Sequence, residues 1–371
     1  MPGAFDVSKD ELTNLLPDQP RYRTLQVWRG LWEKGLRPGD MTDLPKDLRE
    51  RLEGVLVPAL HEVARSVSSD DQTTKWLWQL ADGRRIETVL MLYPDRATVC
   101  VSSQAGCAMG CGFCATGQAG FDRQLSVGEI VEQVVEARRQ ALPRRLSNVV
   151  FMGMGEPLAN YDRTWSAVEL LHLNLGISAR HITVSTVGVV PGIRRLAKEA
   201  LPVNLAVSLH AARDELRDEI VPLNRRYPLA LLMEACGEYL AAKGRRLSFE
   251  WALIDDVNDT HRDASELAEL AFPLGAHVNL IPLNPTPGYA TLGTPAEGVA
   301  AFRAWLGNLG VNATVRANRG TDIAAACGQL AARERPVTLR PKLRARAAQT
   351  GATLGSAAPN SPTGATLSSS G

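Results

Sequence analysis

The sequence of 371 residues has few cysteines and no long apolar segment. No stretch approaches the roughly 20 consecutive apolar residues that span a bilayer, and the first residues, MPGAFDVSKDEL, lack the apolar region of a secretory signal. Six cysteines are too few for a disulfide-framed secreted protein of this length. These absences argue against a membrane protein and favour a cytoplasmic one, in which clustered thiols bind metal or take part in chemistry.

The sequence also has little excess charge, but that charge is unevenly distributed. The formal net charge is +1, and residues 333–346 carry six Arg or Lys against one Glu, so this segment is +5 and the rest of the chain is −4. Such a segment is either a phosphate-binding arm or a solvated tail. The residues after it are rich in Ser, Thr, Gly, Ala and Pro, which predicts disorder. Residues 333–371 are therefore expected to be a basic and then disordered C-terminal tail.

The beginning of the chain has helical periodicity. The runs SKDELTNLL, YRTLQVWRGLWEKG and LPKDLRERLEGVL predict short helices, and Trp28 and Trp32 share a helical face that we expect to be a core. Residues 1–75 are thus predicted to form a small N-terminal helical accessory domain. After it, Asp82 and Gly83 lie between two alternating runs, which predicts a β-hairpin over residues 76–96 that we interpret as a linker.

From residue 97 the pattern is strand, loop and helix, repeated. This alternation predicts parallel strands with crossover helices, and Ser126 with Glu129 forms a capping box that marks one helix start. No dinucleotide-binding G-x-G-x-x-G motif follows a strand. We therefore expect an α/β fold, a partial (β/α)6 barrel like that of the TIM fold, over residues 97–332, with functional groups at the carboxyl ends of its strands. The runs expected to be strands are ATVCVSS, NVVFMG, HITVSTVG, VNLAVSLH, LSFEWALID, HVNLIPLNP and NATVRAN.

Three cysteines follow the first of these strands with C-x3-C-x2-C spacing: Cys107, Cys111 and Cys114. A structural zinc site needs four protein ligands, and no fourth Cys or His is nearby. A [4Fe-4S] cluster held by three thiolates instead leaves one iron open for a substrate ligand. The spacing therefore predicts such a cluster, and the alternative is three core cysteines on a glycine-rich loop.

In its motifs the chain resembles the radical S-adenosylmethionine (SAM) methyltransferases that modify adenine C2 in 23S rRNA and tRNA. The resemblance spans about residues 12–332 and is carried by RATVCVSSQAGC, CGFCATGQAGF, VVFMGMGEPLAN, STVGVVPGI, VSLHA, RDEIVPLN, LIPLNPTPG and RGTDIAAACGQLA. It implies methylation of an adenosine in the peptidyl-transferase centre of 23S rRNA, and of the adenosine next to the anticodon in tRNA. It also implies two SAM molecules per turnover, an electron donor such as flavodoxin or ferredoxin, and a monomer.

The resemblance assigns roles to residues outside the cysteine loop. It implies that Cys327 in AAACGQL carries the methyl group as S-methylcysteine, that Cys100 resolves the intermediate through a transient disulfide with Cys327, and that Glu87 accepts a proton. Without it, both cysteines would be interpreted as small buried apolar residues and Glu87 as a surface strand residue. Cys236 has no such match and is expected to be core.

The same motifs imply contacts to SAM at other strand ends. The matching residues are Gly155, Glu156, Ser185, Ser208, Leu209, His210 and Asn284. For RNA, the N-terminal helices and the pairs Arg225-Arg226 and Arg245-Arg246 are candidate contacts to the phosphate backbone.

Two other functions compete with this one. The sister resistance methylase that acts on C8 of the same rRNA adenine shares the cluster and both reactive cysteines, but Pro157 in GMGEP and the N-terminal helices favour the C2 enzyme. The other is a non-catalytic RNA-binding protein with a structural metal site.

Overall fold

A computed structural model describes residues 3–286, 288–316 and 319–332, so the basic segment and tail predicted over residues 333–371 lie outside the described residues. The described chain is organised around one ten-stranded sheet, with the strand order β1-β2-β3-β4-β7-β8-β9-β10-β11-β12. The remaining strands, β5 (Gln104–Gly106) and β6 (Phe121–Gln124), form a separate antiparallel pair. This pair encloses the cysteine loop, and no local pattern in the sequence predicts it.

The larger part of the sheet is parallel. Every neighbouring pair from β4 through β7 to β12 is parallel, and no pairing joins β1 to β12 within the described residues, so the sheet is an open barrel. The predicted partial (β/α)6 barrel is confirmed, with β12 added after the sixth unit. The parallel strands are β4 (Ala97–Cys100), β7 (Leu146–Phe151), β8 (Ile182–Thr186), β9 (Asn204–Ser208), β10 (Leu247–Leu253), β11 (His277–Pro282) and β12 (Ala313–Val315).

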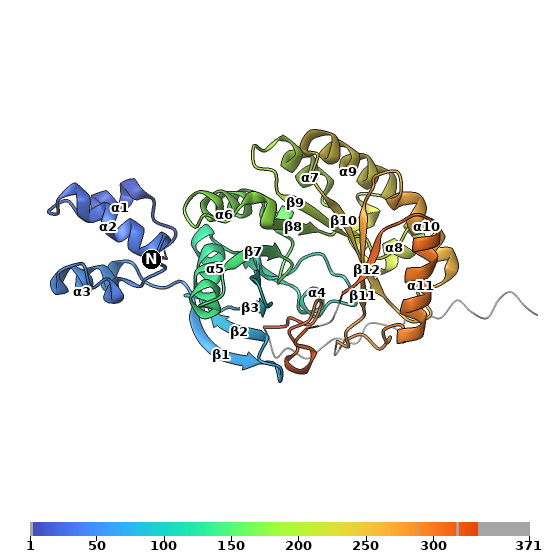
Figure 1. Cartoon of the computed structure of the whole chain (residues 1–371), viewed down its shortest axis with the longest axis horizontal. Coiled ribbons are helices and arrows are strands. Elements are labelled where there is room, and N and C mark those ends of the chain that lie inside the picture. The colour runs from blue at the N-terminus through green and yellow to red at the C-terminus, as the bar shows by residue number, and fades with distance from the viewer. Residues whose placement is uncertain (1–2, 287, 317–318, 333–371) are drawn as a thin grey trace, which may run out of the picture.

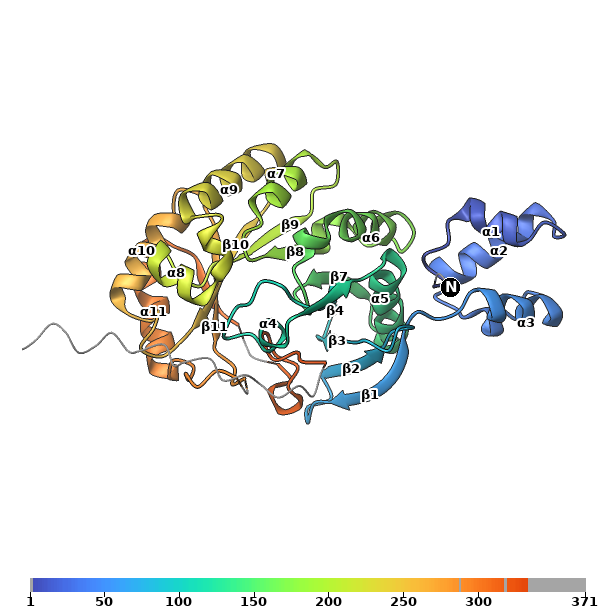
Figure 2. The same ribbon diagram turned by 180° about the vertical axis from the view of Figure 1, so that it is seen from behind.

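Helices connect these strands and cover the outer face of the curved sheet, whereas α4 lies on its inner side (Figures 1 and 2). Strand β10 is buried at every position because it is covered on both faces. Helix α5 begins at the predicted capping box of Ser126 and Glu129. The helices are α4 (Ala115–Ala119), α5 (Val127–Ala141), α6 (Tyr161–Leu173), α7 (Val190–Lys198), α8 (Asp214–Ile220), α9 (Leu229–Lys243), α10 (His261–Ala271) and α11 (Ala296–Asn308). Short 3-10 segments are η1 (Pro38–Asp40), η2 (Pro157–Asn160), η3 (Ala179–His181), η4 (Pro222–Arg225) and η5 (Thr321–Ile323).

The N-terminal segment contains the three predicted helices, α1 (Lys9–Leu15), α2 (Arg21–Trp32) and α3 (Lys46–Val55). The rings of Trp28 and Trp32 pack 5.3 Å apart, and Trp32 is buried, so the aromatic stripe is core as predicted. The helical prediction is wrong beyond α3, because residues 61–67 form strand β1 (His61–Val67). The mostly exposed residues of β1 give no clear apolar period, and its antiparallel pairing with β2 determines its conformation.

The predicted hairpin is present as β2 (Thr73–Gln79) and β3 (Arg85–Leu92), with Gly83 at φ +80° in the turn. Strand β3 also pairs with β4. The hairpin therefore extends the barrel sheet, which differs from our interpretation of it as a linker.

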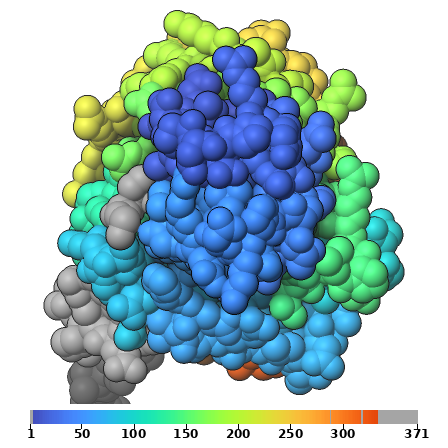
Figure 3. All heavy atoms as spheres, turned by 90° about the vertical axis from the view of Figure 1, so that its left-hand side faces the viewer, coloured from blue at the N-terminus to red at the C-terminus, as the bar shows by residue number. Residues whose placement is uncertain are grey.

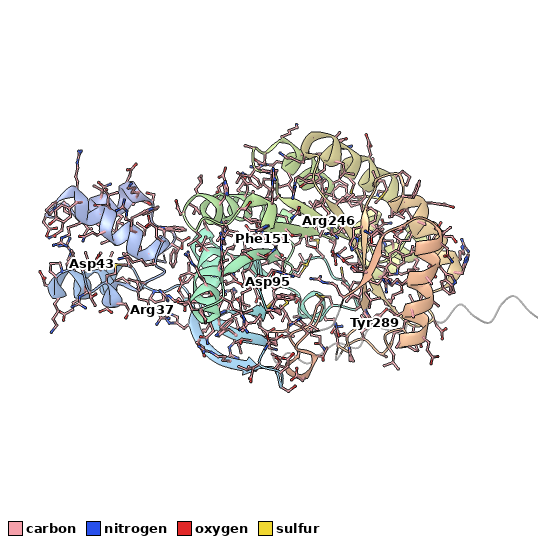
Figure 4. The ribbon with its side chains drawn as sticks, in the orientation of Figure 1. Arg37, Asp43, Asp95, Phe151, Arg246 and Tyr289 are labelled. Atoms are coloured by element: carbon pink, nitrogen blue, oxygen red, sulfur yellow. The ribbon has the colours of Figure 1, made fainter. Side chains whose placement is uncertain are left out.

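The N-terminal segment lies against α5 (Figures 1 and 3). The carboxylate of Asp6 accepts hydrogen bonds from Gly128 N at 2.6 Å and Ser126 Oγ at 3.1 Å, and so caps the start of α5. Further along the same helix, Glu132 accepts from Ala59 N at 2.8 Å. Figure 4 shows Arg37 and Asp43 on this segment, well away from Phe151 in the barrel. In the described part of the chain, no helix has the length and apolar character needed to cross a membrane.

Candidate active site

The carboxyl ends of the parallel strands meet at one cavity, which we call the cluster cavity. Its walls come from the cysteine loop and from the residues at or just after β7, β8, β9, β10, β11 and β12. Parallel strands bring such residues together because their carboxyl ends lie on one edge of the barrel. The predicted site residues that line it are Cys107, Cys111, Cys114, Gly155, Glu156, Ser185, Ser208, His210, Asn284 and Cys327.

The three cysteines lie on the loop between β5 and α4. The loop closes on itself through a hydrogen bond from Cys107 N to Gly120 O at 2.8 Å. Gly106 has φ +76°, and a Cβ placed there would lie 2.0 Å from Gly120 O. Glycine is therefore required at this position for the loop to close.

The three thiols fit an iron–sulfur cluster better than a single metal ion. Among the described residues, no three His, Cys, Asp or Glu side chains converge closely enough to hold one ion, whereas a cluster spreads its thiolates over different irons. Burial raises the pKa of Cys107 to about 12 and also raises the pKa of Cys111 and Cys114. Thiols in this environment remain protonated until a cation replaces the proton. Phe113 packs beside Cys111 and is itself buried.

His210 faces the cluster cavity in a constrained conformation. Its φ is +61°, its Nδ1 accepts a hydrogen bond from Ala252 N at 2.9 Å, and its carbonyl oxygen accepts from Asn258 Nδ2 at 2.8 Å. Burial, followed by the charge of Arg217, lowers the pKa of His210 to about 3. Because Nδ1 is an acceptor, the neutral ring carries its proton on Nε2, where it can donate.

Glu156 supplies the acidic group of the cluster cavity. Its carboxylate accepts from Leu158 N at 3.0 Å and from Val187 N at 2.9 Å, and burial raises its pKa to about 7. Beside it, Gly155 has φ +99°, and a Cβ there would lie 2.5 Å from the Cβ of Gln104. The backbone can therefore approach a ligand closely here only because residue 155 is glycine.

Two serines and an asparagine complete the predicted cofactor contacts. The hydroxyls of Ser185 and Ser208 lie 3.5 Å apart on neighbouring strands, and Asn284 Nδ2 donates to Cys327 O at 3.2 Å. Leu209 differs from its neighbours, because its side chain is fully buried in the core and does not line the cavity. Its N–H donates to Glu250 O at 3.0 Å and its carbonyl oxygen accepts from Arg217 Nε at 3.0 Å, so its backbone groups are already used within the strand ends.

Sequence reasoning missed Arg217, which organises the strand ends beneath this cavity. Its guanidinium is buried and donates to Leu209 O at 3.0 Å, Val187 O at 2.6 Å and Asn224 Oδ1 at 2.8 Å. Burial lowers its pKa to about 10. The motif RDEIVPLN contains both Arg217 and Asn224, but no local pattern marks an arginine as buried.

A second, smaller cavity adjoins the first, and we call it the resolving cavity. It is lined by Cys100 at the end of β4, by Tyr93, and by Met152, Arg316 and Cys327, which also line the cluster cavity. Burial raises the pKa of Cys100 to about 12. All six cysteines are free thiols in the structure, so the transient disulfide remains a prediction.

Comparisons with known proteins agree with this geometry. Residues 101–268 match the Radical SAM superfamily. The chain is 52% identical over 357 residues to the probable dual-specificity RNA methyltransferase RlmN of Parafrankia sp., covering 90% of this chain and 92% of that protein. The chain belongs to the radical SAM family of dual-specificity RNA methyltransferases. A relative of the same printed name from Chloroflexus aurantiacus is 51% identical over 349 residues, with 89% of this chain and 92% of that protein covered.

A solved structure also supports membership of this methyltransferase family. The crystal structure of a radical SAM methyltransferase from Sphaerobacter thermophilus aligns with a TM-score of 0.86 and 49% identity, covering 89% of this chain and 99% of that chain. The predicted fold and family are thereby confirmed. The family as a whole implies a [4Fe-4S] cluster and SAM, with which the cysteine loop is consistent.

Glu87, the predicted proton acceptor of this methyltransferase, lines neither cavity. Its carboxylate is buried, lies 3.0 Å from Lys75 Nζ and accepts a hydrogen bond from Ala331 N at 2.8 Å. Lys75 Nζ in turn donates to Ala324 O at 3.0 Å. Glu87 and Lys75 therefore hold both ends of the segment that carries Cys327.

The two candidate arginine pairs lie at opposite ends of the barrel. Arg245 and Arg246 immediately precede β10, so they are at the amino ends of the strands, away from the cavities, and Arg245 Nη2 donates to Asn204 Oδ1 at 3.0 Å. Figure 4 labels Arg246. Arg225 and Arg226 lie between α8 and α9, at the end where β9 terminates and the cluster cavity opens, and both are exposed.

Proposed function

We propose that this protein methylates C2 of adenine in 23S rRNA and in tRNA, with Cys327 as the methyl carrier and two SAM molecules used per turnover. The observation that carries the proposal is the position of Cys327, which borders both the cluster cavity and the resolving cavity. A methyl carrier has to meet the methyl donor on one side and the resolving thiol on the other. The RNA substrates follow from the relatives, which are named dual-specificity RNA methyltransferases.

Cys107, Cys111 and Cys114 would hold the [4Fe-4S] cluster. SAM would contact Gly155, Glu156, Ser185, Ser208, His210 and Asn284, and Leu209 would support these residues from the core. When bound, cluster and SAM together supply the radical chemistry that an unreactive aromatic C–H requires. The buried carboxylate of Glu156 can accept from an ammonium group, and the neutral ring of His210 can donate through Nε2.

The chain's own residues complete the reaction. The Cys327 sulfur accepts the methyl group and later becomes bonded through that carbon to adenine C2. Glu87 accepts the proton that leaves C2 once the segment that carries Cys327 has shifted from its carboxylate and the base has come within hydrogen-bond reach. The Cys100 sulfur then attacks the Cys327 sulfur. An S–S bond forms, the S–C bond breaks, and its electron pair stays on the carbon, which takes up the proton given up by Cys100 and becomes the methyl group of the released base.

RNA recognition is proposed for the accessory domain over residues 1–75, for Arg225 and Arg226, and for the basic segment over residues 333–346. The hairpin over residues 76–96 connects that domain to the catalytic barrel over residues 97–332. We further propose a monomer that acts in the cytoplasm with a flavodoxin or ferredoxin as electron donor. The target adenine must be unstacked to reach Cys327.

One experiment tests the chemistry and its specificity. The anaerobically reconstituted protein is incubated with SAM, a reductant and either rRNA or tRNA, and the RNA is digested for nucleoside analysis. The proposal expects 2-methyladenosine from both RNAs. Finding 8-methyladenosine would instead identify the sister resistance enzyme, and methylation of one RNA alone would restrict the substrate. Zinc in place of iron, with no deoxyadenosine formed, would favour the non-catalytic RNA-binding protein.

A further inference from the structure

We propose that Arg316 is a positioning residue that holds the Cys327 sulfur at the opening between the cluster cavity and the resolving cavity, where its charge pairs with the sulfur that attacks the methyl donor. This inference rests on the proposed role of Cys327 as methyl carrier. It assigns a function to a residue that lies just after β12.

The contacts of Arg316 place its charge at this opening. Its Nη1 lies 4.0 Å from Cys327 Sγ, 3.4 Å from Glu250 Oε2 and 3.5 Å from Met152 Sδ. Arg316 and Cys327 both line both cavities. By contrast, Cys100 lines only the resolving cavity and Cys111 only the cluster cavity. The sulfur beside Arg316 is therefore the one thiol with access to both cavities among the described residues.

The guanidinium is held in place from behind. Glu250 is buried, and its Oε1 accepts from Asn279 Nδ2 at 2.8 Å and from Ser248 Oγ at 3.1 Å, which leaves Oε2 for Arg316. The backbone N–H of Arg316 donates to Leu280 O at 2.8 Å. A planar guanidinium fixed by a carboxylate on one edge presents its remaining N–H groups in a defined direction.

The other cations near the segment that carries Cys327 form contacts with groups other than its sulfur. Lys75 contacts Glu87 and Ala324 O, and Arg319 donates to Leu92 O at 3.2 Å while stacking on the Tyr93 ring. Among the described residues, Arg316 is the cationic side chain that contacts the sulfur of Cys327. The pKa of Arg316 lies above its ordinary range, first because of Cys327 and then because of Glu250.

This pairing has a chemical consequence. When the thiolate attacks the methyl carbon of SAM, a new S–C bond forms, the sulfonium C–S bond breaks, and its electron pair leaves with S-adenosylhomocysteine. The negative thiolate and the positive sulfonium both become neutral, and no proton has to move. Arg316 then has no anion at Cys327, so the neutral thioether is released from it. The charge thus holds the sulfur before methyl transfer and not after it.

The test measures the reactivity of Cys327 in the full-length, anaerobically reconstituted protein. The variants Arg316→Gln and Arg316→Lys are treated with neutral iodoacetamide and with anionic iodoacetate. Mass spectrometry of the Cys327 peptide follows the unmethylated fraction. Because Arg316 places a positive charge beside the sulfur that becomes the nucleophile, Arg316→Gln should lower the iodoacetamide rate about tenfold. It should lower the iodoacetate rate further, because the reagent's own charge is no longer attracted. Arg316→Lys should restore most of both rates.

A second variant and a control separate electrostatics from packing. Glu250→Gln can still accept from Asn279 and Ser248 but no longer presents a carboxylate oxygen to Arg316. The guanidinium loses its anchor, so the iodoacetamide rate should fall, by about threefold for one partly screened charge. Arg319→Gln removes an equal charge from the same cavity wall but not from the sulfur, and should leave the iodoacetamide rate of Cys327 unchanged.

Equal rates in Arg316→Gln and the parent protein would overturn the proposal, as would an unchanged rate in Glu250→Gln. If Arg316→Gln does not fold, the fall expected in Glu250→Gln still decides the question. If the parent protein methylates no RNA while the Arg316 effect persists, only the proposed function fails.

Discussion

Glu87 accepts a hydrogen bond from the backbone N–H of Ala331 at 2.8 Å, across 244 residues of sequence. The same carboxylate is 3.0 Å from Lys75 Nζ, so it is both paired and buried. A residue expected to take a proton from substrate thus also holds the segment that carries Cys327. The two roles of Glu87 can be tested separately, because glutamine at this position can still accept the hydrogen bond from Ala331 N but cannot accept a proton from the substrate.

Replacing Glu87 with Gln should therefore abolish product formation but preserve the site. We expect RNA methylation to fall by about 100-fold or more, the usual contribution of a general base, while methylation of Cys327 and iron content stay near the parent values. Nucleoside analysis and peptide mass spectrometry measure the two effects. Normal RNA methylation by this variant would mean that Glu87 serves only to hold the segment.

The two reactive cysteines should give opposite outcomes. Cys100→Ala should accumulate a covalent protein–RNA adduct, visible on a denaturing gel, because the resolving thiol is missing. Cys327→Ala should form no adduct and no methylated RNA. Cys236→Ala is the matched control, since Cys236 is buried in α9 and lines neither cavity. Free, normally methylated RNA from Cys100→Ala would exclude its resolving role.

The cysteine loop should determine iron binding. Replacing Cys111 with Ala should remove most of the iron and the visible absorbance of the anaerobically reconstituted protein, because a cluster left with two thiolates is poorly held. Cys100→Ala should retain both, since Cys100 lies in the other cavity. Iron content that does not change in Cys111→Ala would contradict the assignment of the ligands.

Arginines at the two ends of the barrel should differ in RNA binding. Replacing Arg225 and Arg226 with Gln should weaken binding and reduce the slope of log K against log salt by about 1 for each phosphate that the protein no longer neutralises. The same change at Arg245 and Arg246 is the control, because that pair precedes β10 at the opposite end. Equal effects of the two double variants would show that RNA does not approach from the cavity end.

Glu132 predicts a pH dependence of stability. Burial raises its folded-state pKa from 4.5 to about 7, so between these values the folded chain binds more protons than the unfolded chain. Stability should therefore fall as pH rises through this window, by about 3 kcal/mol in total. The Glu132→Gln variant does not lose stability in this way as pH rises. Its melting temperature should therefore rise relative to that of the parent protein from about pH 5 to about pH 8. Glu169→Gln, at an exposed position of α6, should show a constant difference. A constant difference for Glu132→Gln would contradict the prediction.

Local sequence was sufficient for most of the barrel. The parallel strands were predicted from short strand-like runs separated by helix-length segments, and β10 (LSFEWAL) is such a run although Ser248 and Glu250 interrupt its apolar residues. The capping box at Ser126 is likewise a local signal. Strand β1 and the β5–β6 pair were not predicted, because their pairing partners, and not their own residues, determine their conformation. The period of two along β9 already separates Leu209 from Ser208, and so could have predicted that Leu209 faces the core.

The sequence by itself determined the family and the cysteine motif, and its resemblance to that family predicted the roles of Cys100 and Cys327, because these depend on residue type and short spacing. Only the tertiary structure decided that Cys327 borders two cavities, that Glu87 holds its segment, and that Arg316 and Glu250, 66 residues apart, pair beside it. It also placed Arg245 and Arg246 away from the site. The physical reason is that these contacts depend on how strand ends that are far apart in the sequence come together in space. The periodicity of residues along the chain carries no information about the distances between those strand ends.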